Sequence, residues 1–169
     1  MPEQVVEREQ MVPRPLAEVF DFFSRAENLE ALTPPFLRFR ILTPLPVEMK
    51  AGAVIEYRLS LYGIPVRWKT LIEAWEEGER FVDVQVKGPY KSWRHEHRFE
   101  AAGDSTRMRD RVAYSMPLGP LGTLVHALFV RRSVERIFDY RREKIGELLG
   151  APAGGKGERC GRGGGMGQG

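Results

Sequence analysis

Residues 93–114 read WRHEHRFEAAGDSTRMRDRVAY, a pattern typical of a two-stranded hairpin. Aromatic or imidazole side chains stand at the odd positions from 93 to 99, and charged side chains stand between them. Strict alternation puts the two sets on opposite faces of a strand. Residues 101–104 have the composition of a turn, and after them the pattern inverts, so that positions 106, 108, 110, 112 and 114 share the inner face.

The inner face of this hairpin carries polar groups among apolar ones. If the hairpin closes on residues 101–104, His95 lies opposite Asp110 and His97 lies opposite Met108. Two imidazoles and a carboxylate then sit among Trp, Phe, Tyr and Val side chains. Because buried polar groups need partners, this face is either a satisfied network in the core or the wall of a pocket.

The rest of the chain supplies more strands and two short helices. Alternation predicts strands over residues 5–12, 37–41, 53–62, 66–75 and 81–87. In the last of these, either the valines or Phe81 and Asp83 face inward. Pro15 suits the first turn of a helix, and residues 24–27 have the capping-box spacing of a second. The sequence therefore predicts two short helices after the first strand.

From about Gly119 to Leu149 the apolar residues recur at helical spacing. This predicts one long amphipathic helix of about 45 Å, at about 1.5 Å per residue. Residues 151–169 contain nine glycines and no aromatic residue, which favours a flexible tail. We therefore expect an α+β domain over residues 1–150, with a curved antiparallel sheet of six or seven strands wrapped around the long helix, and a tail over residues 151–169.

Composition argues against several classes of protein. The net charge of the 169 residues is +3, but the tail holds three basic residues and one acidic residue, so residues 1–150 carry only +1. That balance argues against a nucleic-acid partner. The single cysteine, Cys160, excludes a disulfide within the chain. The start of the chain lacks the features of a signal peptide, and no apolar run is long enough to span a membrane, so we expect a cytoplasmic protein that makes at most transient membrane contact.

The hairpin and the helix after it share residues with a known superfamily: Gly88, Pro89, Tyr90, Trp93, His95, His97, Phe99, Thr106, Asp110, Val112, Tyr114, Pro117, Gly119, Phe138, Tyr140 and Arg141. Over residues 3–149 the chain resembles the helix-grip (SRPBCC) superfamily, which includes START lipid-transfer domains, the birch-pollen-allergen fold, polyketide cyclase/aromatases and coenzyme-Q-binding proteins. It is most similar to bacterial members described as cyclase/dehydrase-like or cell-division-inhibitor-like. The resemblance implies a helix-grip fold, which hosts carriers, enzymes and sensors alike.

A cavity between the sheet and the long helix follows from this fold whenever the inward side chains do not fill it. We expect it to be bordered by aromatic, polar and helix residues: Tyr57, Trp68, Trp93, His95, His97, Asp110, Tyr114, Leu124 and Leu128. The favoured function is non-enzymatic binding of a hydrophobic small molecule, such as a lipid, an isoprenoid quinone or a polycyclic aromatic, with no cofactor.

Two other functions remain open at this stage. The first is a cyclase/aromatase-type enzyme in which His95 and Asp110 perform acid–base chemistry, since a carboxylate fixes the imidazole tautomer. The second is a protein-interaction module. A metal site is disfavoured because one aspartate is the only obvious third ligand beside His95 and His97.

Overall fold

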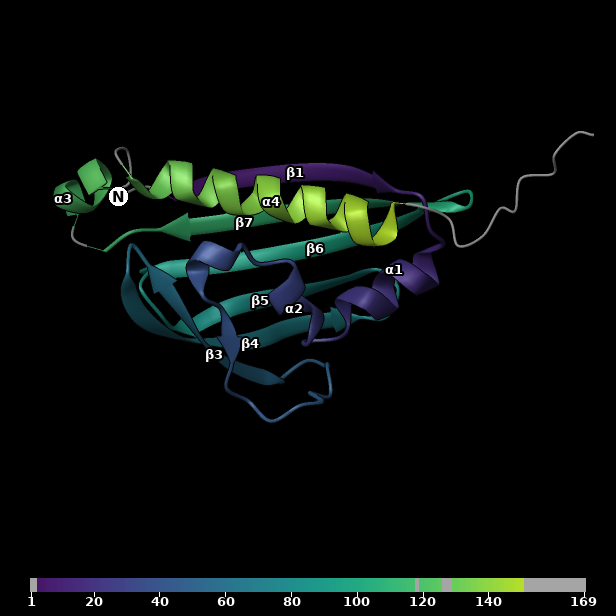
Figure 1. The fold of residues 1–169 in the computed structure, drawn as a ribbon, viewed down its shortest axis with the longest axis horizontal. Coiled ribbons are helices and arrows are strands. Elements are labelled where there is room, and N and C mark those ends of the chain that lie inside the picture. Colours follow the sequence, from purple (N-terminus) through teal and green to yellow (C-terminus); the bar gives the residue numbers. More distant parts are fainter. Residues whose placement is uncertain (1–2, 118, 126–128, 151–169) are drawn as a thin grey trace, which may run out of the picture.

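The structure is a computed structural model that describes residues 3–117, 119–125 and 129–150. One antiparallel sheet has the strand order β1-β7-β6-β5-β4-β3-β2 (Figure 1). The strands are β1 (Gln4–Val12), β2 (Arg40–Ile41), β3 (Val54–Leu61), β4 (Ile64–Glu76), β5 (Arg80–Lys87), β6 (Ser92–Ala102) and β7 (Ser105–Ser115). The helices are α1 (Leu16–Phe23), α2 (Asn28–Ala31), the 3-10 turn η1 (Pro35–Leu37), α3 (Gly119–Val125) and α4 (Arg131–Leu149).

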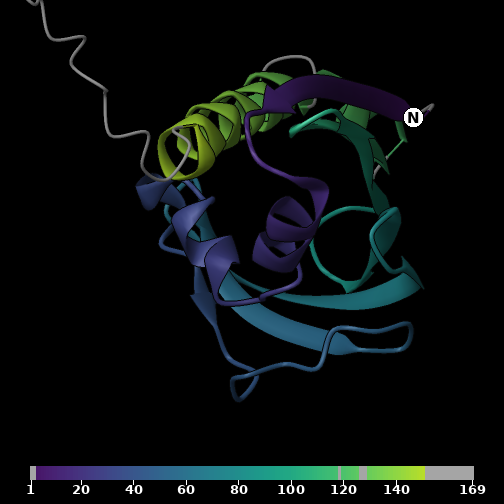
Figure 2. The same cartoon turned by 90° about the vertical axis from the view of Figure 1, so that its right-hand side faces the viewer.

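The sheet curves so strongly that it forms most of a barrel, with α4 along the open side (Figure 2). α4 packs against β1, and α1 contacts β6 and β7 at one end of the concave face. The predicted α+β helix-grip fold, with two short helices after the first strand, is confirmed. The predicted tail, residues 151–169, lies outside the described residues.

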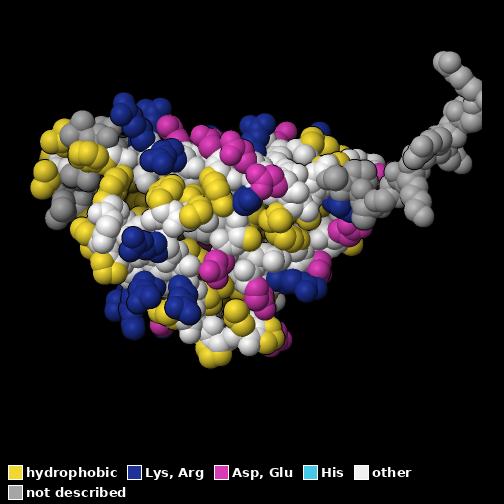
Figure 3. Space-filling view, in the orientation of Figure 1, with side chains coloured by type: hydrophobic (Ala, Val, Ile, Leu, Met, Phe, Trp, Pro, Cys, Tyr) yellow, Lys and Arg dark blue, Asp and Glu magenta, His cyan; other side chains and the backbone are white. Residues whose placement is uncertain are grey.

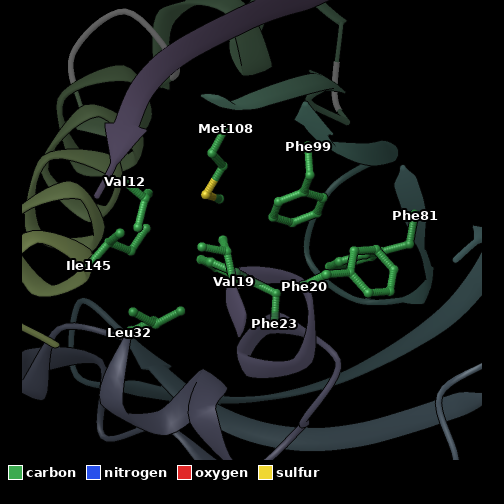
Figure 4. Packing of buried hydrophobic residues seen from close by; sticks show 9 residues of the cluster. All are labelled: Val12, Val19, Phe20, Phe23, Leu32, Phe81, Phe99, Met108 and Ile145. Atoms are coloured by element: carbon green, nitrogen blue, oxygen red, sulfur yellow. The ribbon is translucent and has the colours of Figure 1, made fainter. Parts of the chain in front are cut away.

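Two apolar clusters fill much of the concave side. The first lies at the α1 end and joins α1 to the sheet: Val12, Val19, Phe20, Phe23, Leu32, Phe81, Phe99, Met108 and Ile145 (Figure 4). Phe20 meets Phe99 edge to face at 5.4 Å between centroids, and Phe81 stacks on Phe99 at 5.9 Å. The second lies under α4 and consists of Val112, Tyr114, Val130, Val134 and Phe138. These clusters are the solid parts of the core.

The β6–β7 hairpin closes on two residues rather than on the four predicted. Ala102 pairs with Ser105, so the loop is only Gly103 and Asp104. Gly103 has a φ of 62°, the left-handed conformation that a two-residue hairpin turn requires and that glycine adopts without strain. The tight turn matches the twist of the strands, and residues 101 and 102 extend β6 instead of forming the loop.

The tighter turn corrects the predicted register. His97 lies opposite Asp110, whereas His95 lies opposite Val112. Phe99, not His97, is the partner of Met108. A shift of two positions preserves the alternation of faces, so the predicted inward set stays inward while its cross-strand partners change.

The prediction of one helix from Gly119 to Leu149 is corrected to two elements, α3 and α4, with residues 126–128 between them lying outside the described part of the chain. The nineteen residues of α4 span about 28 Å, and the eleven residues of β7 span about 37 Å. Figure 1 shows α3 set apart from α4 at the end of the sheet.

Three local expectations also change. The predicted strand over residues 37–41 is reduced to β2, because Leu37 belongs to η1. The Ser24 hydroxyl donates to the Phe20 carbonyl oxygen at 2.7 Å, so Ser24 closes α1 instead of capping α2. In β5 the open choice is settled by pairing: Phe81 lies opposite His97 and Asp83 opposite His95, on the inner face.

The outer surface carries charges of both signs. Arginines of β7 pair with glutamates of β1, as Arg109 does with Glu9 at 2.8 Å and Arg111 with Glu7 at 3.1 Å. Figure 3 shows basic and acidic side chains interspersed on the face that includes α4, with hydrophobic side chains gathered near α3. Among the described residues, no helix is long and apolar enough to cross a membrane.

Candidate ligand cavity and buried histidine–aspartate cluster

A cavity of about 170 Å3 lies between the two apolar clusters, enclosed by the sheet on one side and α4 on the other. Strands β3 to β6 supply about half of its lining residues, and α1, α2, η1, α4 and the loops between the elements supply the rest. Its lining includes Phe23, Leu37, Phe39, Ile55, Tyr57, Leu59, Trp68, Thr70, Ile72, Phe81, Asp83, Tyr90, Trp93, His95, His97, Ile137, Phe138 and Arg141.

Aromatic side chains form one wall of the cavity. Tyr57 stacks on Trp68 with centroids 5.9 Å apart, and Trp68 meets Trp93 edge to face at 5.4 Å. The hydroxyl groups of Tyr57 and Thr70 are 3.2 Å apart and share a hydrogen bond. Burial raises the pKa of Tyr57, so its hydroxyl stays neutral. The indole Nε1 of Trp68 is buried and has no hydrogen-bond partner among the described residues.

Two imidazoles and two carboxylates form a buried cluster at another part of the wall. The rings of His95 and His97 lie 3.7 Å apart between centroids. His97 Nε2 is 3.0 Å from Asp83 Oδ2, and His95 Nε2 is 3.2 Å from Asp110 Oδ1. Both contacts are diagonal across neighbouring strands, because the directly opposed pairs are His95 with Asp83 and His97 with Asp110.

The second nitrogen of each ring faces the other aspartate. His95 Nδ1 is 3.7 Å from Asp83 Oδ2, and His97 Nδ1 is 2.7 Å from Asp110 Oδ1. The latter approach is short but too bent for a hydrogen bond. Arg141 of α4 adds a cation, with its Nε 3.7 Å from Asp110 Oδ2. Each imidazole is therefore held between Asp83 on one side and Asp110 on the other.

The environment separates the proton affinities of the two histidines. Burial lowers the pKa of His95, and the neighbouring His97 lowers it further, more than the aspartates raise it. Burial also opposes charge on His97, but Asp110 and Asp83 outweigh it and raise the pKa of His97. His97 is therefore the more basic of the two imidazoles, and a proton taken up by the pair goes to His97.

Both carboxyl groups stay ionised for related reasons. Burial alone would raise the pKa of Asp110, but Arg141 and the imidazoles hold it well below its usual range. Burial likewise opposes ionisation of Asp83, and the hydrogen bond from His97 with the nearby His95 lowers its pKa. The cluster is thus a network of charges that compensate one another in a buried place.

Five of the predicted site residues line the cavity: Tyr57, Trp68, Trp93, His95 and His97. Asp110 does not line it, because the histidine rings stand between its carboxylate and Asp83, which does. Tyr114 belongs to the cluster under α4. Leu124 lies in α3 and is 55 % exposed. Leu128 lies outside the described residues.

Several lining residues were not predicted, and three of them contact the histidine cluster: Asp83, Phe138 and Arg141. Asp83 shares its face with Phe81, and this alternation was a signal for it in the sequence, but the valines of β5 gave an equally good inward set. Phe138 and Arg141 are spaced i, i+3 and therefore share one face of α4. Phe138 meets the His95 ring edge to face at 5.5 Å, so this helix face closes the cavity over the cluster.

Comparison with known proteins gives a family match and several similar folds. A family model described as "Polyketide cyclase / dehydrase and lipid transport" matches residues 12–138. Comparison with curated proteins gives no match. Among solved structures, protein CV1439 from Chromobacterium violaceum is similar with a TM-score of 0.68 and 10% identity, over 88% of this chain and 99% of that one.

Two further similar structures have descriptive names. The Zhui aromatase/cyclase from Streptomyces sp. R1128 has a TM-score of 0.63 and 13% identity, over 87% of this chain and 96% of that one. A START superfamily protein from Mycobacterium smegmatis has a TM-score of 0.60 and 16% identity, over 85% of this chain and 98% of that one. At these identities the likeness establishes the fold and nothing finer.

Proposed function

Because the chain belongs to the polyketide cyclase/dehydrase and lipid transport family, we propose that it binds a compact aromatic or otherwise apolar molecule with one polar group in its cavity. The observation that carries this proposal is the make-up of the cavity wall. Tyr57, Trp68 and Trp93 offer flat apolar surfaces, while the polar groups concentrate around His95 and Asp83. Such a site selects a ligand by shape and by a few placed polar contacts.

The size of the cavity narrows the class of ligand. A cavity of about 170 Å3 is close to the engineered apolar cavity of about 150 Å3 that holds benzene, and smaller than the range of about 300–1,000 Å3 for drug-sized ligands. Among the ligand classes expected from the sequence, a small ring system fits best. A lipid chain or the tail of an isoprenoid quinone would need the walls to move apart.

Unpaired donors in the wall favour a ligand that carries an oxygen. Trp68 Nε1 and Arg141 Nη2 are buried, and neither has a hydrogen-bond partner among the described residues. An unsatisfied buried donor costs about 1–3 kcal/mol. Because both residues line the cavity, a carbonyl or hydroxyl oxygen of the ligand would accept from one of them. We therefore propose that the ligand is oxygenated.

Titration with 1-naphthol, followed by tryptophan fluorescence, tests this proposal. We expect one naphthol to bind per chain, and more tightly than naphthalene, which lacks the oxygen. Leu59→Phe adds volume at a cavity-lining position on β3 and should weaken naphthol binding at least about tenfold, the equivalent of about 1.4 kcal/mol. Arg58→Phe, on the exposed face of the same strand, is the matched control. Equal binding by the wild type and Leu59→Phe would overturn the proposal.

Acid–base catalysis is a second candidate, because one histidine is arranged as a base. Asp110 contacts His95 Nε2, which leaves His95 Nδ1 on the side of Asp83 and the cavity. A lowered pKa keeps His95 neutral and able to accept a proton. This function predicts that the chain speeds hydrogen–deuterium exchange beside the carbonyl of 1-tetralone in D2O, measured by NMR. Equal exchange rates with the wild type and His95→Gln would exclude it.

A further inference from the structure

Three side chains place metal-ligand atoms together at the cavity wall. Asp83, His95 and His97 each offer one ligand atom, and these atoms all lie within 4.8 Å of one another. Asp83 Oδ2 is 3.0 Å from His97 Nε2 and 3.7 Å from His95 Nδ1. Ligand atoms at about 2.0–2.2 Å from one ion are about 3.0–3.5 Å apart. The two separations from Asp83 are therefore close to the spacing of one face of a coordination shell, and the third, between the two ring nitrogens, is within 4.8 Å.

In each of the two histidines, the ring nitrogen on the far side from Asp83 lies close to a second carboxylate. Asp110 contacts His95 Nε2 at 3.2 Å and His97 Nδ1 at 2.7 Å. A ligating histidine usually gives its other N–H to a carboxylate, which fixes the tautomer and makes the ligating nitrogen more basic. Asp110 hydrogen-bonds His95 Nε2, which leaves His95 Nδ1 as the lone pair on the side of Asp83. His97 Nδ1 lies close to the same carboxylate without the angle of a hydrogen bond, and His97 Nε2 faces Asp83. Both His95 Nδ1 and His97 Nε2 are therefore turned toward an ion beside Asp83.

Charge also favours a cation at this place. With both imidazoles neutral, Asp83 and Asp110 carry two negative charges against the single positive charge of Arg141. The side chains of the two aspartates are 18% and 8% exposed, and an uncompensated charge is costly at such burial. A proton on His97 offsets this charge; a divalent ion that displaced the proton would supply the cation in its place and leave the cluster with one positive charge in excess.

We propose that Asp83, His95 and His97 bind a divalent transition-metal ion through two imidazole nitrogens and one carboxylate, with the remaining coordination positions open to the cavity. All three residues line the cavity, whereas Asp110 does not. Two histidines and one carboxylate with open positions suit Fe2+, Zn2+ or Co2+ and not Mg2+ or Ca2+, which prefer all-oxygen sites. An oxygen of a cavity ligand would then have a Lewis acid within reach.

Co2+ titration of the untagged chain, followed by visible absorption and calorimetry, tests this site. We expect one Co2+ per chain, displaced by Zn2+ and not by Mg2+. Asp83→Ala should abolish binding, and Asp110→Asn should weaken it about 10- to 100-fold. Asp139→Asn, exposed on α4, and His126→Ala, the only other histidine, should bind as the wild type does. Binding that survives Asp83→Ala, or that is lost with His126→Ala, would overturn the proposal.

A measurement on the wild type covers the case in which a variant fails to fold. Zn2+ should shift the imidazole NMR signals of His95 and His97 and leave those of His126 in place. Unchanged signals of His95 and His97 at saturating Zn2+ would refute the site. Naphthol titration in EDTA separates the two proposals. If naphthol binds in EDTA and the chain takes up no Co2+ in the titration described above, the ligand cavity is supported and the metal site is rejected.

Discussion

Asp110→Asn is the substitution that most directly tests the charge balance of the buried cluster. The change keeps the shape of the side chain and removes its charge, so Arg141 and His97 lose the anion that they share. Breaking a buried ion pair from one side costs about 3–5 kcal/mol. For a chain of this size each kcal/mol corresponds to about 2–4 °C in the melting temperature. We therefore expect a loss of about 6–20 °C.

Thermal unfolding followed by circular dichroism measures this effect, and Asp139→Asn is its control. Asp139 is 63% exposed and makes a 3.6 Å ion pair with Arg8, so its loss should cost at most about 1 kcal/mol. The double variant Asp110→Asn with Arg141→Met removes both charges. Its melting temperature should therefore fall by less than the sum of the decreases caused by the two single substitutions. If Asp110→Asn melts no lower than Asp139→Asn, the compensation described above does not stabilise the fold.

Three other outcomes follow from the packing, the turn and the pKa shifts. Phe138→Ala should lower the free energy of unfolding by about 3–5 kcal/mol, because Phe138 is 5% exposed and closes the cavity. Urea unfolding measures this loss, and a loss below about 1 kcal/mol would contradict the place of Phe138 in the core. Gly103→Ala should cost about 1–2 kcal/mol from its φ of 62° alone, since a Cβ there meets no atom within 4 Å; equal unfolding midpoints would argue against this turn. Asp110 has a lowered folded pKa, so its stabilisation is complete above its ordinary value of 3.8 and is lost as the pH falls below that value. The melting temperature of the wild type should then fall more steeply than that of Asp110→Asn between about pH 4 and pH 2, and parallel curves would refute this assignment.

Local pattern was sufficient for the fold and for the direction of the histidines. His95 and His97 face inward because the charged residues between them cannot all be buried, and this argument needs no partner strand. The register needed more than pattern. A shift of two positions leaves every inward residue inward, so parity could not distinguish His95 from His97 as the partner of Asp110.

Residues that reach the site from other elements were harder to predict. Asp83 depends on which face of β5 turns inward, and both choices leave an apolar set on one side. Arg141 depends on where α4 crosses the sheet, which the spacing of apolar residues on one helix does not determine.

The length of the exposed loop after β6 determines which histidine of β6 lies opposite the buried Asp110 of β7. Pairing β7 with β6 two residues further along would move Asp110 by about 7 Å and place it opposite His95. Such a slip would exchange one pair of buried neighbours for another and leave every side chain on its own face. Variation in the length of a solvent-exposed hairpin is therefore a route by which descendants of one fold can acquire different buried chemistry without a single substitution in the wall.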